Sequence, residues 1–242
     1  MGRIENEKKH GEYLAEHGAE QIWNWSSPAG QRRWERRVKM LTDGIRPEHK
    51  VLELGCGTGD FTKEIIKTGA DITAIDISPV LLDIARRNIS AENVRFVEDN
   101  AYQMSFADNS FDFVIGSSVL HHLEIEKAVA EIFRVLKPNG VMLFTEPNMM
   151  NPQIALQKNI PYIKRKMGDS PDETAFFRWR MAKLLKQNQF ANVSVRPFDF
   201  LHPSVPRKLI KVVSKVGNAF EKCPLIKEIA GSVFISAKKG TN

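Results

Sequence analysis

Three glycines at alternate positions directly follow a short apolar run, and this spacing indicates a ligand-binding loop. Gly55, Gly57 and Gly59 come after residues 51–54, in which Glu53 is the charged residue. Glycine adopts backbone conformations that other residues avoid, so the chain can approach a ligand closely there. We therefore predict a buried strand that turns tightly into a binding loop.

Glu53 indicates the charge of that ligand. A loop that cradles phosphate offers amide groups to an anion, and a neighbouring carboxylate would repel the anion. The spacing is also G-x-G-x-G rather than G-x-G-x-x-G, and no Gly-Lys-Ser/Thr follows it. We expect a ligand with positive charge, such as an ammonium or a sulfonium, rather than a dinucleotide or a triphosphate.

A second acid, Asp76, ends the apolar run at 71–76 and lies 17 residues after Gly59. An acid at about this distance binds the ribose hydroxyls in nucleotide-binding folds. A strand-end or capping acid is the alternative, but the glycine loop favours ribose binding. Ser78 and Pro79 then predict the start of a helix, as its cap and its first residue.

Five motifs in the same order resemble those of class I S-adenosylmethionine-dependent methyltransferases, in the group that includes small-molecule and quinone methyltransferases. The resemblance is close over residues 40–150 and looser over 173–238. The matching motifs are the cofactor loop at 51–60, the ribose acid Asp76, the third and fourth strands within 96–115, the segment 119–123, and the turn into the fifth strand at 135–143.

The resemblance implies S-adenosyl-L-methionine as cofactor. Glu53 would hold its cationic end, directly or through water, and Ile77 would pack on the adenine. The family usually has Asp-Ala after the third strand, where this chain has Asp99-Asn100-Ala101, so the adenine contact stays open between Asp99 and Asn100. The cofactor-binding residues expected in this way are Glu53, Gly55, Cys56, Gly57, Gly59, Asp76, Ile77, Asp99, Asn100, Ala101 and Ser117.

Two histidines, His121 and His122, follow the fourth strand, where related methyltransferases bring cofactor and acceptor together. Histidine is a suitable general base for a hydroxyl or ammonium acceptor. We expect His122 to be that base, with His121 as the second candidate; the alternative is a structural role at the start of a helix at 124–136. No Cys/His cluster has the spacing of a metal site, so we expect no metal.

The alternation of strands and helices predicts a Rossmann-like, doubly wound α/β sheet of seven strands, mostly parallel with the last strand antiparallel. Ligands bind beyond the carboxyl ends of such strands. We expect a helical cap at 1–45 and a methyltransferase domain at 46–242, with insertions at 147–172 and 201–230 that form a lid. A capping box at 170–173 predicts the start of a helix. The strands are expected at 50–54, 71–75, 94–98, 111–116, 139–145, 192–199 and 231–237.

Charge divides the chain. Residues 151–242 hold 17 Lys/Arg and 6 Asp/Glu, a net charge of +11, whereas residues 1–150 hold 18 and 23, a net of −5. A basic half attracts anionic partners. Residues 206–222 combine apolar residues at helical spacing with basic ones. Such a helix more often packs on its own domain as a lid, and contact with a membrane surface is the alternative. We expect the acceptor to be a small molecule or a lipid-linked compound, and an anionic group on it would be attracted to the basic half. We expect methylation at oxygen.

Other function classes are disfavoured. No apolar h-region follows residues 1–9 and the two cysteines, Cys56 and Cys223, suggest no disulfide framework, so a cytoplasmic protein is expected. The chain lacks the Asn/Asp-Pro-Pro-Tyr/Phe tetrapeptide and a paired-cysteine motif, which makes nucleic acid an unlikely substrate. Two alternatives remain: a non-catalytic module that binds the same cofactor, and a nucleotide-dependent oxidoreductase, which Glu53 disfavours. The oligomeric state is not predicted.

Overall fold

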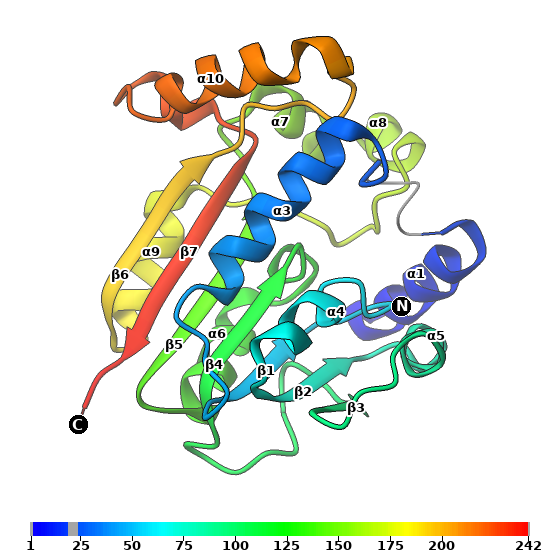
Figure 1. Cartoon of the computed structure of the whole chain (residues 1–242), viewed down its shortest axis with the longest axis vertical. Coiled ribbons are helices and arrows are strands. Elements are labelled where there is room, and N and C mark those ends of the chain that lie inside the picture. The colour runs from blue at the N-terminus through cyan, green and yellow to red at the C-terminus, as the bar shows by residue number, and fades with distance from the viewer. Residues whose placement is uncertain (1, 19–23, 242) are drawn as a thin grey trace.

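A single seven-stranded sheet forms the centre of the molecule (Figure 1). The computed structural model describes residues 2–18 and 24–241. The strand order is β3-β2-β1-β4-β5-β7-β6; β7 runs antiparallel to both of its neighbours, and the other neighbouring pairs are parallel. The expected Rossmann-like sheet is therefore confirmed. Its strands are β1 (Lys50–Leu54), β2 (Asp71–Asp76), β3 (Val94–Glu98), β4 (Phe111–Ser117), β5 (Leu136–Pro147), β6 (Phe190–Phe198) and β7 (Ser232–Lys239).

The strand order reverses between β1 and β4. The chain moves outward from β1 to β3 and then returns to β4 on the other side of β1. Loops that follow two such neighbouring parallel strands diverge and leave a crevice at their carboxyl ends. Glu53 pairs in register with Ala74 of β2 and Ile115 of β4, so the glycine loop emerges at this crevice.

Helices cover both faces of the sheet (Figure 1). Their apolar sides fill one core with Leu41 and Leu82 on one face and another with Ile132 and Leu185 on the opposite face. Burial of these side chains, at about 25 cal/mol per Å² of apolar surface, is the main stabilising term. The helices are α1 (Arg3–His17), α3 (Pro28–Thr42), α4 (Thr62–Ile65), α5 (Pro79–Asn88), α6 (Ile125–Val135), α7 (Pro152–Asn159), α8 (Pro161–Lys166), α9 (Arg178–Gln187) and α10 (Ile210–Phe220), with short 3-10 turns η1 (Ile66–Thr68), η2 (Leu120–His122), η3 (Arg207–Leu209) and η4 (Ile226–Ile229).

The helix predicted to begin at residues 170–173 begins instead at Arg178. The Ser170 hydroxyl donates a hydrogen bond to Glu7 on α1 rather than capping a helix. The segment that follows is extended, because Phe176 N–H donates to Pro147 O at 3.1 Å and Thr174 N–H donates to His121 O at 3.0 Å. These long-range bonds compete with the local capping pattern, and they bring Glu173 to the two histidines.

Two helices, α1 and α3, make up most of the described N-terminal residues. Within them α3 packs directly on the sheet, with Ala29 and Leu41 fully buried, whereas α1 lies against α5. Ser78 caps α5 as predicted, since its hydroxyl accepts from Leu81 N–H. Among the described residues, no helix combines the length and apolar character needed to cross a bilayer.

Candidate active site

The glycine loop after β1 forms one wall of a cavity of about 180 Å³ at the carboxyl ends of β1, β2 and β4. Gly55, Gly57 and Gly59 have φ values of +67°, +54° and +84°, a region that favours glycine. A Cβ at Gly55 would lie 2.3 Å from Val119 Cγ2, whereas a Cβ at Gly57 would meet nothing within 4 Å. The loop therefore packs tightly at Gly55 and leaves room for a ligand at Gly57.

Asp76 holds this loop in place from the end of β2. Its Oδ2 accepts from Gly57 N–H at 2.8 Å and its Oδ1 accepts from Ser78 N–H at 2.9 Å. Burial raises the pKa of Asp76, although these amide bonds oppose the rise. Asp76 lines the cavity, and a carboxylate oxygen can accept more than one hydrogen bond, so this group is suited to accept bonds from ribose hydroxyls.

Glu53 lies beneath the loop and not in the cavity wall. It is buried, and the Thr62 hydroxyl donates to its Oε2 at 2.6 Å. Burial raises its pKa to about 8, and the nearby charges of Asp76 and Asp60 add to the rise, while Thr62 opposes it. Glu53 is consequently protonated at neutral pH unless a cation approaches it.

Cys56 lies within the same loop and lines the cavity. Its N–H donates to Ile75 O at 2.9 Å, which fixes the loop to β2. Burial raises the pKa of its thiol, and the charges of Glu53 and Asp76 raise it further. The side chain is therefore a protonated, packed thiol.

The segment after β3 forms the far end of the cavity. Asp99, Asn100 and Ala101 all line it, as does Ile77. Asp99 Oδ2 accepts from both the N–H and the hydroxyl of Ser105 at 2.9 Å, and Asn100 Oδ1 accepts from Tyr102 N–H at 3.0 Å. Both side chains thus already stabilise the turn, and neither is singled out for the adenine contact.

Helix α1, which lies within the segment expected to form a helical cap, lines this cavity. Gly11 allows the close approach, since a Cβ there would lie 2.5 Å from the Ser78 hydroxyl oxygen. Trp34 of α3 stacks on Phe61 with a ring separation of 3.7 Å. Of the other aromatic residues in the N-terminal segment, Trp25 lines the cavity and Tyr13 does not, while Trp23 lies outside the described residues. The wall residues from α1 are Ile4, Glu7, His10, Gly11 and Leu14.

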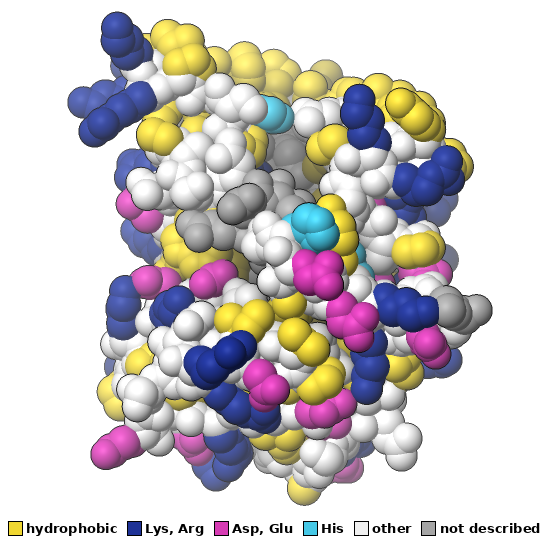
Figure 2. Space-filling model, turned by 90° about the vertical axis from the view of Figure 1, so that its right-hand side faces the viewer, with side chains coloured by type: hydrophobic (Ala, Val, Ile, Leu, Met, Phe, Trp, Pro, Cys, Tyr) yellow, Lys and Arg dark blue, Asp and Glu magenta, His cyan; other side chains and the backbone are white. Residues whose placement is uncertain are grey.

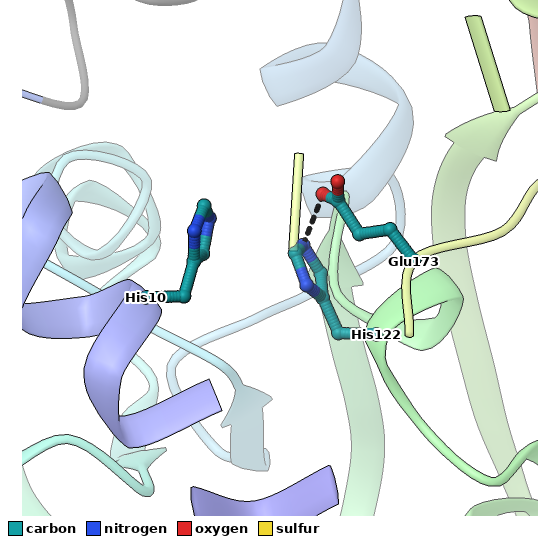
Figure 3. Close-up of side chains that lie close together, drawn as sticks. All are labelled: His10, His122 and Glu173. Carbon is teal, nitrogen blue, oxygen red and sulfur yellow. Dashed lines mark ion pairs between the residues drawn. The ribbon is translucent and has the colours of Figure 1, made fainter. Parts of the chain in front are cut away.

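His122 lines the same cavity beside α1 and lies between two carboxylates. Its Nδ1 is 2.8 Å from Glu7 Oε2, and its Nε2 is 3.1 Å from Glu173 Oε1. Figure 3 shows Glu173 on one side of His122 and His10 of α1 on the other. Burial and the neighbouring His122 lower the pKa of His10. Despite burial, the pKa of Glu173 lies well below its usual range, because His121, His122 and Lys158 favour the carboxylate.

His121 is buried and bound at both ring nitrogens. Its Nδ1 is 2.7 Å from Glu146 Oε2, and its Nε2 is 3.4 Å from Glu173 Oε1. Burial lowers the pKa of His121, but the two carboxylates outweigh that effect and raise it to about 9. Glu146 Oε1 also accepts the N–H groups of Val119 and Leu120. A charged His121 orients this segment and, at neutral pH, is poorly suited to accept a proton.

His10, His122 and Glu173 also have the donor types of a divalent-metal site. One ligand atom from each lies within 4.8 Å of the others. Sequence spacing could not have revealed this trio, because α1, η2 and the extended segment each supply one member. Both ring nitrogens of His122 lie within ion-pair distance of a carboxylate, although Nδ1 makes no well-aligned hydrogen bond among the described residues.

A second cavity, of about 520 Å³, adjoins the first and shares Trp25 and Ser118 with it. His121, Glu146 and Glu173 line one side. On the other side Arg33 and Arg37 each donate to Asp199 Oδ2 at 2.8 Å. The remaining wall comes mainly from α7 and from residues 199–204.

Most of the residues expected from the sequence meet at the first cavity. Glu53 and Gly59 support the loop from outside the wall, and His121 belongs to the second cavity. The expected residues that line the first cavity are Gly55, Cys56, Gly57, Asp76, Ile77, Asp99, Asn100, Ala101, Ser117 and His122.

Comparison with known proteins decides the family. The family model described as a methyltransferase domain matches residues 52–144. A demethylmenaquinone methyltransferase of Staphylococcus aureus is 31% identical over 187 residues, which cover 68% of this chain and 77% of the relative. The chain is a class I S-adenosylmethionine-dependent methyltransferase. A second demethylmenaquinone methyltransferase of Staphylococcus aureus is 36% identical to this chain over 137 residues, which cover 54% of this chain and 56% of that relative.

Solved structures share the fold of this methyltransferase. A chain from the complex of the Haloferax volcanii Trm112 methyltransferase activator with a methyltransferase has a TM-score of 0.71 at 13% identity, covering 97% of this chain and 98% of that one. Phosphoethanolamine N-methyltransferase 2 of Haemonchus contortus, in complex with S-adenosyl-L-methionine, has a TM-score of 0.65 at 18% identity, covering 92% of this chain and 56% of that one. The cofactor of this family fits the open loop at Gly57 and the Asp76 carboxylate in the cavity wall.

Proposed function

We propose that this enzyme methylates an oxygen atom of a small-molecule or lipid-linked acceptor held in the second cavity. The observation that carries the proposal is the junction of the two cavities at Ser118 and Trp25, beside the buried histidines. When bound, S-adenosylmethionine supplies an electrophilic methyl group and leaves as a neutral thioether. The chain has to align the acceptor with that methyl group and remove a proton from it.

In this proposal the first cavity binds the cofactor. Asp76 accepts bonds from the ribose hydroxyls, and Ile77 packs on the adenine. The backbone at Gly55, Cys56 and Gly57 follows the methionine portion, with Ser117 at the end of β4. The support is their shared location in one wall. Glu53 acts from beneath the loop as a carboxylate that ionises when a cation approaches.

His122 is the proposed general base. An acceptor hydroxyl would replace Glu173 at Nε2, while Glu7 stays at Nδ1 and stabilises the imidazolium that forms. A carboxylate partner of this kind fixes the orientation and tautomer of a catalytic histidine. His121 has a different proposed role: its positive charge keeps Glu173 ionised and in place.

Arg33 and Arg37 support an anionic acceptor. They lie one turn apart on α3, and the single carboxylate of Asp199 leaves the group with a net positive charge. Burial lowers the pKa of Arg37 to about 10, so it stays charged at neutral pH, and its Nε has no hydrogen-bond partner among the described residues. An acid group on the acceptor would find its partner in this wall.

The insertions 147–172 and 201–230 are proposed to select the acceptor, and residues 1–45 to close the site. Support comes from the cavity walls: α7 and residues 199–204 line the second cavity, and α1 lines the first. The relatives are named as methyltransferases of demethylmenaquinone, so a quinone-type acceptor, which would take the methyl group on a ring carbon, is the second candidate.

Transfer of an isotopically labelled methyl group from the cofactor into fractionated cell extract tests the proposal. We expect one labelled product whose label is bound to oxygen, and extraction into organic or aqueous phase identifies a lipid-linked or a polar acceptor. Label on nitrogen or carbon would contradict oxygen methylation. Label on nucleic acid alone would contradict the acceptor class.

A further inference from the structure

Helix α10 carries a row of apolar side chains that nothing in the described chain covers. Leu209, Val212, Val216 and Phe220 recur at helical spacing and are exposed, with 60% of Val212 accessible. The opposite side packs on the domain, since a Cβ at Gly217 would lie 3.1 Å from Phe200 Cβ. The expected packing as a lid is thus found for the inner side of α10 only.

The exposed row continues onto neighbouring segments. Leu225 follows α10 and is 84% accessible, and η4 then exposes Ile226 and Ile229. Figure 1 places α10, this turn and α7 along the same edge of the molecule, and Figure 2 shows hydrophobic side chains gathered there. We call this surface the docking face; its apolar residues are Leu209, Val212, Val216, Phe220, Leu225, Ile226 and Ile229.

The charge around the docking face is positive. Residues 207–229 contain two acids, and both are neutralised from outside the segment: Glu221 by Arg36 and Glu228 by Arg178. None of the basic side chains in the segment pairs with an acid among the described residues. These six unpaired groups are Arg207, Lys208, Lys211, Lys215, Lys222 and Lys227.

We propose that the docking face binds the surface of an anionic lipid bilayer. A helix with an apolar row beside lysines lies in a membrane interface, where its apolar side chains enter the acyl boundary and its cations meet the headgroups. A second copy of the chain fits less well, because a symmetric contact would bring six unpaired cations against six others. An anionic bilayer offers acyl chains to the apolar row and anionic headgroups to the cations at the same time.

The location of the docking face gives it a role in acceptor delivery. Residues 200–204, which lead into α10, and Ile154 of α7 line the second cavity, so the same segments form the docking face and the acceptor wall. A lipid-linked acceptor would thus reach the cavity without leaving the bilayer. This route rests on the proposed function, whereas membrane binding does not.

Sedimentation with vesicles, in the absence of cofactor, tests the binding. The vesicles are phosphatidylcholine alone, or an equal mixture of phosphatidylcholine and phosphatidylglycerol. We expect the enzyme to sediment with the mixed vesicles and to be released by salt. Val216→Asp should lower the partition coefficient at least about fivefold. Val80→Asp is the matched control, since Val80 is 40% accessible and Val216 45%, but Val80 lies on α5, away from this face.

Charge reversal provides a second test. Lys211→Glu with Lys215→Glu should reduce binding at least about tenfold, because each cation near an anionic surface contributes on the order of 1 kcal/mol. Lys183→Glu with Lys186→Glu makes the same change on exposed residues of α9 and should leave binding within about twofold. Unchanged thermal unfolding midpoints confirm that the variants fold.

Three results would overturn the proposal. The first is that the enzyme does not sediment with mixed vesicles, and the second is that Val216→Asp binds them like the unmodified chain. The third is a dimer in analytical ultracentrifugation that Val216→Asp dissociates, which would assign the face to self-association. Each result is independent of methyl transfer, so failure of the proposed function would not produce it.

Discussion

Glu173 Oε1 lies 3.1 Å from His122 Nε2, and the same oxygen lies 3.4 Å from His121 Nε2. One carboxylate therefore joins the histidine in the wall of the cofactor cavity to the histidine in the wall of the second cavity. Glu7 and Glu146 bind the far nitrogens of the two rings. The result is a continuous buried array in which carboxylates and imidazoles alternate.

This array predicts that His122→Asn lowers the turnover number by about 10²–10³, since removal of a general base typically has an effect of this size. Cofactor affinity should change less than about twofold, because Asp76 and the loop stay in place. In a plot of turnover number against pH, the variant would lack the dependence on pH that ionisation of the base produces. Full activity in His122→Asn would show that the acceptor needs no base from this residue.

Asp76→Ala should weaken cofactor binding at least about tenfold, or 1.4 kcal/mol, when measured by calorimetry. The change removes the acceptor for ribose hydroxyls and also the bond that holds Gly57 N–H. Asp71→Ala is the matched control, since Asp71 begins the same strand but is exposed. Equal affinity in the two variants would argue against ribose binding at Asp76.

Cofactor binding should release a proton from Glu53. Its pKa of about 8 in the empty site means that it is protonated at pH 7, and a cation above the loop would favour the carboxylate. Calorimetry in buffers of different ionisation enthalpy measures the release, and Glu53→Gln should abolish it. If the unmodified chain releases no proton, Glu53 does not respond to the cationic end of the cofactor.

Glu53 also affects stability. Its pKa is higher in the folded chain than in the unfolded chain, so the folded state holds the proton more tightly. The free energy of unfolding therefore falls as pH rises from about 4.5 toward 8. Glu53→Gln should remove that part of the pH dependence in urea titrations.

His121 produces a different stability profile. Its pKa is raised to about 9, so its contribution is fully present below about pH 6.5 and is lost as pH rises through 9. His121→Gln should lower the free energy of unfolding by about 2–3 kcal/mol at pH 7 and remove this alkaline decline. His17→Gln, an exposed histidine on α1, is the control that should show neither effect.

Metal removal should leave methyl transfer unchanged. Both nitrogens of His122 lie within ion-pair distance of carboxylates, so the array needs no ion to complete it. Dialysis against a chelator followed by the transfer assay measures this. Loss of activity that a divalent metal restores would instead assign a metal to His10, His122 and Glu173.

The sequence predicted the sheet well, and most of the residues predicted to bind the cofactor line one cavity, because the signals for both are local. The glycines, Asp76 and the capping Ser78 each lie within a few residues of the strand end that positions them. Glu7, His10 and Glu173 had no such signal, since α1 and the extended segment reach the histidines only through tertiary contacts. The capping box at Ser170 was misleading for the same reason: its hydroxyl bonds to Glu7 instead.

Cys56 places a thiol beside the site of an electrophilic methyl donor. Its thiolate would be the strongest nucleophile in the wall, but burial and the acids Glu53 and Asp76 keep the sulfur protonated. The acids that suit the loop to a cation therefore also protect the enzyme from alkylating itself. Burial is the larger cause, so exchange of Glu53 for a neutral side chain would weaken this protection without removing it.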